Sequence, residues 1–326
     1  MTIKSNSISS LIGNTPLIEL KNLQTGPCQL FVKMECMNLS GSLKDRMAGH
    51  MIDIAEKEGK IKPGDTIIEA SSGNTTLALA HAAILRGYKM HFVVHDKISQ
   101  EKLGCLHMLG AKTTVTQHIY DYTHPEYYRT LAASIAKETP NSCFLDQFNN
   151  PANPEAYEQT LAPELWQGMS GKVDAVIGAV GTGGHMTGIG RFMRRHSPST
   201  KIILADPAGS ILQHYFETHE LIRSTEWLVE GIGADIIPNT CDLSVVDEVV
   251  TIPDKEAFAA LFTLLKKESI LAGTSSGTVL AAALRYCQKQ TEPKRVVTFV
   301  YDGGSKYLSK ICNKDWLKEH DLLDLI

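Results

Sequence analysis

The sequence predicts an α/β protein of two lobes, each a mostly parallel twisted sheet with helices on both faces. Three observations predict it. Strand-like and helix-like segments alternate along most of the 326 residues, and such alternation implies parallel sheets covered by helices. The length exceeds that of one typical domain. The composition, 43% hydrophobic and 21% charged, is that of an ordinary globular protein.

The first half of the chain alternates short apolar runs with segments that carry apolar residues at helical spacing. Gly87, Gly110 and Pro140 lie where three of these helices should stop. The expected strands are 30–34, 66–70, 90–94 and 113–116, and the expected helices are 45–57, 75–85, 101–109 and 127–137.

The second half repeats this alternation after a cluster of turn residues at 149–154, which is the best candidate for a boundary between lobes. In such folds, ligands bind beyond the carboxyl ends of the strands, where loops converge. The expected strands are 173–179, 201–205 and 296–301, and the expected helices are 186–195, 255–268 and 277–288.

Charge and cysteine usage exclude several classes of partner. A net charge of −4 indicates neither nucleic acid nor an anionic membrane surface. The apolar run 77–85 is too short to span a bilayer, and the polar residues 1–10 lack the core of a signal peptide. The seven cysteines form no C-x-x-C pair, which favours a reducing cytoplasm. With the histidines scattered, no metal site is indicated.

The most informative stretch runs from Gly178 to Gly190 and reads GAVGTGGHMTGIG. It follows the apolar run 173–177 and precedes a helix-like segment at 192–195. Residues without side chains let backbone N–H groups converge on a phosphate, and a helix N-terminus adds partial positive charge. The stretch therefore predicts a site for a phosphorylated small molecule.

Two common phosphate motifs do not fit this stretch. A dinucleotide fingerprint needs G-x-G-x-x-G, but the position that follows Gly181 and Gly183 in that pattern is Met186, which weakens the case for a nicotinamide dehydrogenase. A nucleoside-triphosphate loop needs a lysine after the glycines, and none follows them. A plain tight turn is the remaining alternative, and the density of glycines disfavours it.

Lys44 lies where an extended segment turns into a helix, within the sequence SGSLKDR. Small residues rather than a run of charges precede it, so it could be held at a cleft. A partly desolvated lysine loses pKa and can form a Schiff base with an aldehyde. A solvated surface cation is the alternative interpretation.

Two further loops are rich in small polar residues and open helices. Residues 71–76 read SSGNTT and offer hydroxyls, an amide and backbone N–H groups, a combination that suits a carboxylate. Residues 273–277 read GTSSG and repeat the pattern. Ordinary N-capping is the alternative, but the density of polar residues exceeds what one cap requires.

These segments occur in the order found in one enzyme family. The chain resembles, over nearly its whole length, the pyridoxal-phosphate enzymes of fold type II, which include cysteine synthase and cystathionine β-synthase and share a tryptophan synthase β-like fold. The segments that carry the resemblance are SLKDR (42–46), SSGNT (71–75), QFNNPANP (147–154), GTGG (181–184), EGIG (230–233) and TSSG (274–277).

Other segments look most like those of bacterial cystathionine β-synthases. Cysteine synthases normally lack the aspartate found here at position 235. The segments are DPAGSIL (206–212), VEGIGADIIP (229–238), SVVD (244–247), YLSK (307–310) and DWL (315–317).

The resemblance implies a pyridoxal 5′-phosphate cofactor and a role for each matching residue. Lys44 would carry the cofactor as a Schiff base and would take the Cα proton of the substrate. Asn74 would bond the ring hydroxyl oxygen, and the neutral hydroxyl of Ser275 would face the pyridine nitrogen. The residues implied for the phosphate are Gly181, Thr182, Gly183, Gly184 and His185. Those implied for the substrate are Ser71, Ser72, Gly73, Thr75, Gln147 and Gly231.

Four places depart from the family pattern. His185 stands where threonine is usual, and either its imidazole N–H replaces the hydroxyl or its ring merely packs at the helix start. Residues 300–302 read VYD where Leu-Pro-Asp or Leu-Pro-Ser is usual. Thr76 replaces a usual glycine, and Leu39 replaces a common proline.

The implied reaction is β-replacement, in which L-serine and the thiol L-homocysteine condense to cystathionine through an aminoacrylate intermediate. The first alternative is cysteine synthase, with O-acetylserine and sulfide as substrates. The second is a non-catalytic relative that binds the cofactor or a partner protein. No Cys-Pro haem segment precedes Lys44 and few residues follow Trp316, so control by haem or adenosylmethionine is not expected.

The same resemblance, with the turn cluster, predicts the domain organisation. Residues 45–150 are expected to form a smaller, mobile lobe that carries the carboxylate loop. Residues 1–44 and 151–326 are expected to form a larger lobe that carries the phosphate loop. A homodimer is expected from the family.

Overall fold

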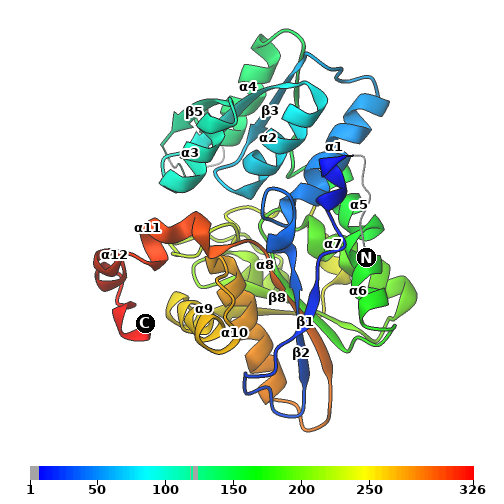
Figure 1. Ribbon diagram of the computed structural model, residues 1–326, viewed down its shortest axis with the longest axis vertical. Helices are drawn as coiled ribbons and strands as arrows, with labels where there is room; N and C mark the ends of the chain where they lie inside the picture. The colour runs from blue at the N-terminus through cyan, green and yellow to red at the C-terminus, as the bar shows by residue number, and fades with distance from the viewer. Residues whose placement is uncertain (1–6, 118, 120–123) are drawn as a thin grey trace.

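The computed structural model describes residues 7–117, 119 and 124–326. Two sheets organise the chain (Figure 1). The larger sheet has the strand order β1-β2-β10-β7-β8-β9, and the smaller one has the order β5-β4-β3-β6. Every named pairing is parallel except that of β1 with β2. The α/β fold with mostly parallel sheets, predicted from the alternation of segments, is therefore confirmed.

The central strands of both sheets are buried along nearly their whole length because helices cover them on both faces. The larger sheet contains β1 (Leu17–Glu19), β2 (Gln29–Met34), β7 (Ala175–Ala179), β8 (Lys201–Pro207), β9 (Glu248–Ile252) and β10 (Arg295–Val300). The smaller sheet contains β3 (Thr66–Ala70), β4 (Lys89–His95), β5 (Lys112–Thr116) and β6 (Ser142–Phe144).

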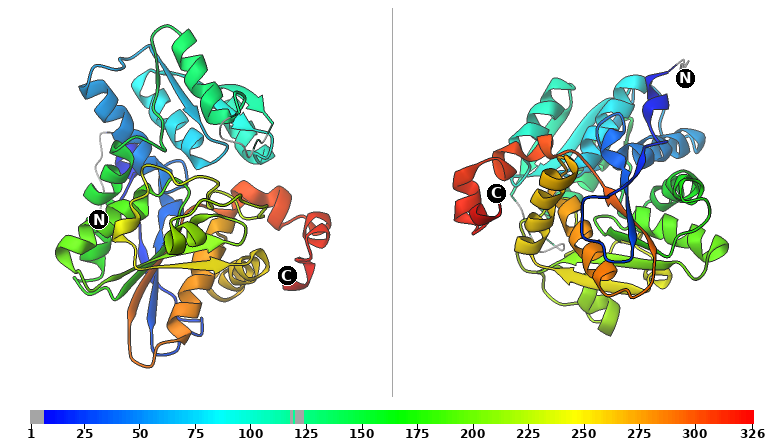
Figure 2. Two further views of the ribbon diagram at one scale, coloured as in Figure 1. Left: turned by 180° about the vertical axis from the view of Figure 1, so that it is seen from behind. Right: turned by 60° about the horizontal axis from the view of Figure 1, so that its bottom comes forward.

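Helices α9 and α10 lie on one side of the larger sheet, and α5, α6 and α7 lie on the other (Figures 1 and 2). The helices are α1 (Lys44–Lys57), α2 (Asn74–Arg86), α3 (Gln100–Met108), α4 (Tyr128–Glu138), α5 (Ala152–Gln159), α6 (Leu161–Gly168), α7 (Gly184–His196), α8 (Leu212–Thr218), α9 (Asp254–Glu268), α10 (Thr274–Gln288), α11 (Leu308–Ile311) and α12 (Lys314–Glu319).

The smaller sheet shows how strand alternation divides the core. Ile67 and Phe92 belong to the large core cluster that includes α2. Their neighbours Ile68 and Val93 face the opposite way and pack with Ala132 of α4 in a separate cluster. Successive side chains of a strand point to opposite faces, so each face receives its own helix layer.

Every strand and helix expected from the sequence is present, with ends displaced by no more than three residues. The turn cluster at 149–154 is only partly a turn, because α5 begins at Ala152. The strands of the smaller sheet all lie between residues 66 and 144. The lobe boundaries at 45 and 150, and the mobility of the smaller lobe, stay predictions.

All seven cysteines are free thiols, and in the described part of the chain no helix is both long and apolar enough to cross a membrane.

Candidate active site

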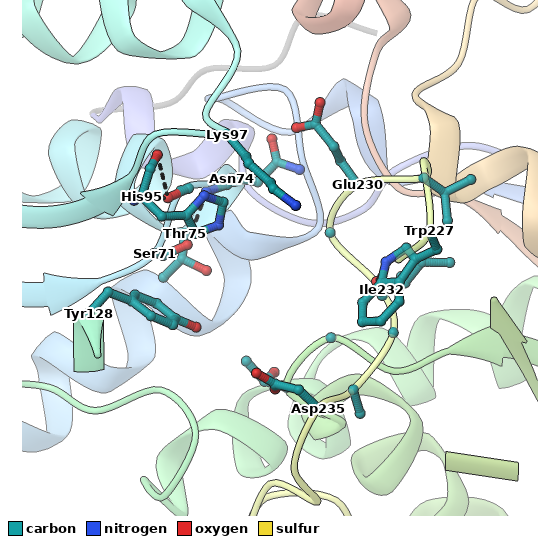
Figure 3. Close-up of a pocket in the computed structure, with 18 of the residues that line it drawn as sticks. Ser71, Asn74, Thr75, His95, Lys97, Tyr128, Trp227, Glu230, Ile232 and Asp235 are labelled. Atoms are coloured by element: carbon teal, nitrogen blue, oxygen red, sulfur yellow. Dashed lines mark hydrogen bonds between the residues drawn. The ribbon is translucent and has the colours of Figure 1, made fainter. Parts of the chain in front are cut away.

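A cavity of about 290 Å³ is bordered by the loops that follow β3, β4 and β7. This is the position that parallel sheets favour for ligands. In Figure 3, Ser71, Asn74 and Thr75 lie on one side of the cavity and Trp227, Ile232 and Asp235 lie on the other. The predicted site residues that line it are Lys44, Ser71, Ser72, Gly73, Asn74, Thr75, Gln147, Gly181, Thr182 and Gly231.

Lys44 reaches the cavity from the first turn of α1. The end of β10 holds the preceding loop, because the Leu43 N–H donates to the carbonyl of Tyr301 (3.0 Å) and Ser42 forms an isolated bridge with Asp302. Burial lowers the pKa of Lys44 to about 8, and the nearby charge of Asp302 partly opposes this shift. A lysine of this kind is suited to Schiff-base formation and proton transfer.

The next residues anchor this turn in the protein interior. Arg46 donates two hydrogen bonds to Glu35 (2.7 and 2.8 Å) and two to Glu164 (2.7 and 2.8 Å). Lys33 also donates to Glu164 (2.7 Å). Burial alone would raise the pKa of Glu164, but hydrogen bonds from Arg46 and Lys33 lower it to about 2. This buried, bidentate network fixes the start of α1, and with it the position of Lys44.

At Gly181, Gly183 and Gly184, between the end of β7 and the first residue of α7, there is no room for a side chain. A Cβ on Gly181 would lie 2.5 Å from the carbonyl oxygen of Gly231. Gly183 has φ +81° and would collide with Cys241, and Gly184 would collide with Asn153. The first N–H groups of α7 have no acceptors within the helix, so the loop forms a cradle for an anion.

Asn153 is a member of this site that the sequence did not single out as a ligand-binding residue. Its amide donates to the carbonyl of Gln147 (2.7 Å) and to Thr182 Oγ1 (3.0 Å), so it connects the two predicted loops. Its Oδ1 is buried, lies against Gly184 and has no hydrogen-bond partner among the described residues. The motif NNPANP contains the signal, but only the folded chain shows which asparagine is buried.

The predicted carboxylate loop is assembled at the N-terminus of α2. Thr75 Oγ1 donates to Gln147 Oε1 (2.6 Å), which joins two residues 72 positions apart. The Gly73 N–H donates to Ser71 Oγ (3.1 Å), and the His95 N–H donates to Ser72 Oγ (2.6 Å). Hydroxyls and helix-terminal N–H groups thus converge in one wall of the cavity, as a carboxylate site requires.

Asn74 is held at both ends of its amide. Its Nδ2 donates to Asp302 Oδ2 (2.7 Å), and its Oδ1 accepts from Lys306 Nζ (2.9 Å). Tyr307 also donates to Asp302 Oδ2 (2.6 Å), while Asp302 Oδ1 lacks a partner among the described residues. Because one neighbour can only accept and the other can only donate, the amide has one orientation.

Four predicted residues are buried and do not belong to the cavity lining given by the described residues: Gly183, Gly184, His185 and Ser275. Gly183 and Gly184 continue the loop that starts at Gly181. His185 is the second residue of α7, and its Nε2 lies 3.0 Å from the hydroxyl of Tyr301. Ser275 is the second residue of α10. Their contacts with a bound cofactor stay predictions.

Comparison with known proteins identifies the family. The model of the family described as "Pyridoxal-phosphate dependent enzyme" matches residues 8–302. The chain belongs to this family. It is 41% identical over 319 residues to the cystathionine beta-synthase of Apis mellifera, covering 97% of this chain and 63% of that protein. It is 36% identical to cysteine synthase 1 of Neurospora crassa, covering 99% and 87% respectively.

A solved structure supports the same assignment. The crystal structure of O-ureido-L-serine synthase superimposes with a TM-score of 0.87 at 30% identity, covering 94% of this chain and 95% of the other. The cystathionine beta-synthase of Rattus norvegicus is 40% identical over 309 residues, which are 55% of its length. The chain therefore spans between 55% and 63% of the length of these two animal cystathionine beta-synthases.

As a pyridoxal-phosphate dependent enzyme, the chain should offer an amine for the aldehyde and a cradle for the phosphate of the cofactor. The residues present fit both requirements. Lys44 borders the same cavity as Gly181 and Thr182. No Cβ fits at Gly181, Gly183 or Gly184, and the buried Asp302 Oδ1 and Asn153 Oδ1 lack partners among the described residues. Asp302 and Asn153 are hydrogen-bonded to Asn74 and Thr182, which line the cavity, and unpartnered buried atoms at such positions are typical of a ligand site.

A cluster of charged side chains also lines this cavity. Glu230 accepts from Lys102 (2.8 Å) and from Lys310 (2.5 Å). Burial would raise the pKa of Glu230, but the two lysines lower it. Lys102 Nζ also lies 4.0 Å from the ring centroid of Tyr307, a cation–π contact. The sequence pattern did not reveal this cluster, because Lys102 and Glu230 are 128 residues apart.

No group of three or more histidine, cysteine, aspartate or glutamate side chains in the described residues could hold a metal ion. His91 and His95 are four residues apart, but they lie on strand β4. Four strand residues span about 13 Å, which is too far for one ion to bridge.

Proposed function

We propose that this protein catalyses a β-replacement in which L-serine and L-homocysteine are joined to form cystathionine. The observation that carries the choice of substrates is Asp235, which is part of the resemblance to cystathionine β-synthases and which lines the cavity opposite Ser71 and Thr75 (Figure 3). The identities of 41% and 40% to two cystathionine beta-synthases support the same choice.

The bound cofactor supplies an aldehyde that bonds the substrate amine and a ring that accepts electrons. The chain supplies placement and proton transfer. Lys44, with a pKa of about 8, is neutral in roughly one molecule in ten at pH 7, so it can accept the Cα proton of serine. The resulting ammonium can then return a proton to the departing hydroxyl group.

The remaining residues position the substrate and the cofactor. The N-terminus of α2, with Ser71, Ser72, Gly73, Thr75 and Gln147, holds the carboxylate of the amino acid. Asn74, fixed by Asp302 and Lys306, would present its amide to the ring hydroxyl oxygen of the bound cofactor. A neutral hydroxyl at Ser275 does not keep the pyridine nitrogen protonated as a carboxylate would, which favours β-elimination over transamination.

Cysteine synthase activity is the second candidate, and one observation favours it. The match to cysteine synthase 1 of Neurospora crassa extends over 87% of that protein, against 63% of the Apis mellifera relative. In this case O-acetylserine would be the donor and sulfide the nucleophile. The same lysine and the same two loops would serve both reactions.

A direct comparison of the two substrate pairs tests the proposal. With purified holoenzyme, kcat/KM for serine plus homocysteine should exceed that for O-acetylserine plus sulfide by at least about tenfold. The reverse order would replace the proposal with cysteine synthase activity. Lys44→Ala should lose turnover with both pairs, because both reactions need the Lys44 amine to bond the cofactor aldehyde and to take the Cα proton. A yellow protein whose absorbance does not respond to serine would instead indicate a non-catalytic relative.

A further inference from the structure

Two positions at which the chain departs from its family pattern are in direct contact. His185, where threonine is usual, is the second residue of α7. Tyr301, where proline is usual, follows the last residue of β10. Their polar atoms, His185 Nε2 and Tyr301 Oη, are 3.0 Å apart although the residues are 116 positions apart in the chain. The two departures are therefore parts of one structural feature.

Aromatic neighbours give the imidazole a single position. His185 is 3% exposed. Its ring makes edge-to-face contacts with Tyr157, Phe299 and Tyr301, at centroid distances of 5.9, 5.7 and 5.1 Å. Phe299 and Tyr301 stack on each other. A ring enclosed in this way cannot turn toward solvent, so its two nitrogen atoms have fixed directions.

The hydrogen bonds of Tyr301 determine which nitrogen of His185 carries the proton. The Ala179 N–H donates to the phenol oxygen of Tyr301 (2.9 Å). The phenol keeps its own proton, since burial raises the pKa of Tyr301. Burial and the charge of Lys44 lower the pKa of His185 well below its usual value, so the imidazole is neutral. Among the described residues the Tyr301 O–H has no acceptor other than Nε2 of His185, which places the ring proton on Nδ1.

We propose that Tyr301 fixes His185 in the tautomer with the proton on Nδ1, and that this N–H is a side-chain donor to the phosphate of the cofactor. His185 lies in the first turn of the helix that follows the glycine cradle, where N–H groups and the helix dipole favour an anion. With Tyr301 in place, the Nδ1–H of His185 replaces the threonine hydroxyl of the family pattern as a hydrogen-bond donor. Tyr301 is thus a positioning residue.

A matched pair of variants separates the two nitrogens. The amide nitrogen of asparagine takes the place of Nδ1, and the amide of glutamine takes the place of Nε2. His185→Asn should therefore keep the affinity for pyridoxal phosphate within about threefold. His185→Gln should weaken it by about tenfold or more, as the loss of a hydrogen bond to a charged group does. Affinity is measured by titrating the full-length apoprotein with pyridoxal phosphate.

Two further readouts isolate the phosphate contact. Pyridoxal lacks the phosphate, so its affinity should be the same for His185→Gln and the wild type. The ³¹P resonance of the holoprotein should shift in His185→Gln and Tyr301→Phe but much less in His185→Asn. His185→Thr, which restores the usual residue, should bind pyridoxal phosphate more tightly than His185→Gln does and about as tightly as the wild type. Circular dichroism of each variant reports whether it is folded.

Three results would overturn the inference. They are an unchanged affinity and ³¹P shift in a folded His185→Gln, equal losses in the Asn and Gln variants, or the same loss for pyridoxal as for its phosphate. Each of these would leave His185 as a packing residue. None of the measurements uses an amino-acid substrate, so the outcome is independent of whether homocysteine or sulfide is the nucleophile.

Discussion

Lys44 joins two properties that usually exclude each other: it is enclosed by protein, and its amine must exchange protons. Its pKa of about 8 results from burial, opposed by the charge of Asp302. The free amine is charged below this pKa and neutral above it. Only the neutral amine attacks an aldehyde. The rate at which apoprotein takes up pyridoxal phosphate should therefore rise with pH, with a midpoint near 8, as followed by stopped-flow absorbance. A flat profile between pH 6 and 9 would contradict the assignment.

Asp302 should raise this midpoint above the value that burial alone would give. Its carboxylate favours the charged form of Lys44 and so raises the pKa of the lysine. Asp302→Asn removes the charge, while its amide oxygen can still accept from Asn74 and Tyr307. The midpoint of cofactor uptake should move to lower pH in this variant. An unchanged or higher midpoint would show that the carboxylate does not act on the lysine.

The sequence indicated those residues of the site that belong to compact motifs. Lys44 and Ser71–Thr75 are recognisable because small and polar residues surround them within a few positions. Asp302 and Lys306 hold Asn74 but are 228 and 232 positions away from it. The sequence around them gives no sign of this contact. Partners that meet only through tertiary structure cannot be found from the spacing of residues.

Two of the helices that the sequence missed, α5 and α6, carry a proline near their start, while α8, α11 and α12, which it also missed, have seven residues or fewer. Pro154 belongs to the cluster that predicted a turn, but it is the third residue of α5, and Pro163 is likewise the third residue of α6. The N–H groups of the first turn have no acceptor in the helix, so a proline there costs no hydrogen bond. Strands β1 and β6 were missed because they have only three residues each, too few for a periodic pattern to emerge.

Glycine within helices distinguishes packing from propensity. Gly277 of α10 contacts α9 so closely that a Cβ would collide with the carbonyl of Ala257 and lie 2.9 Å from Leu261 Cβ. Gly104 of α3 has no atom within 4 Å of such a Cβ. Gly277→Ala should lower the free energy of unfolding by about 1–3 kcal/mol through overpacking. Gly104→Ala should raise it by about 0.5–1 kcal/mol through helix propensity. Urea denaturation measures both, and equal effects would refute the packing argument.

At the scale of the whole molecule, the segment that follows β10 of the larger sheet is hydrogen-bonded to the start of α3, a helix of the smaller sheet. Ser99 donates to the carbonyl of Lys306 (3.0 Å), and Glu101 accepts from the Ser309 N–H (2.8 Å). Lys102 of α3 pairs with Glu230 (2.8 Å). The alternation of elements predicted two sheets, but not this contact, since it joins residues about 200 positions apart in the first two cases. Closure of a smaller lobe over the cavity would have to accommodate these bonds.

Lys102→Met tests how firmly this contact holds α3. The methionine fills the buried space of the lysine stem but cannot bond Glu230, which keeps Lys310 as a partner. Amide hydrogen exchange within α3 should therefore speed up several-fold, while exchange in the buried strand β7 stays unchanged.

Lys97→Met is the matched control, because it removes the same charge from an exposed pair with Glu226 (3.6 Å). Exposed ion pairs contribute little to stability, whereas partly buried ones are less screened by solvent. Exchange in α3 should thus stay at the wild-type rate in Lys97→Met. If the two variants behaved alike, net charge rather than the Lys102–Glu230 bond would control α3. If neither changed the exchange rate, the hydrogen bonds of Ser99 and Glu101 would be sufficient to hold the helix.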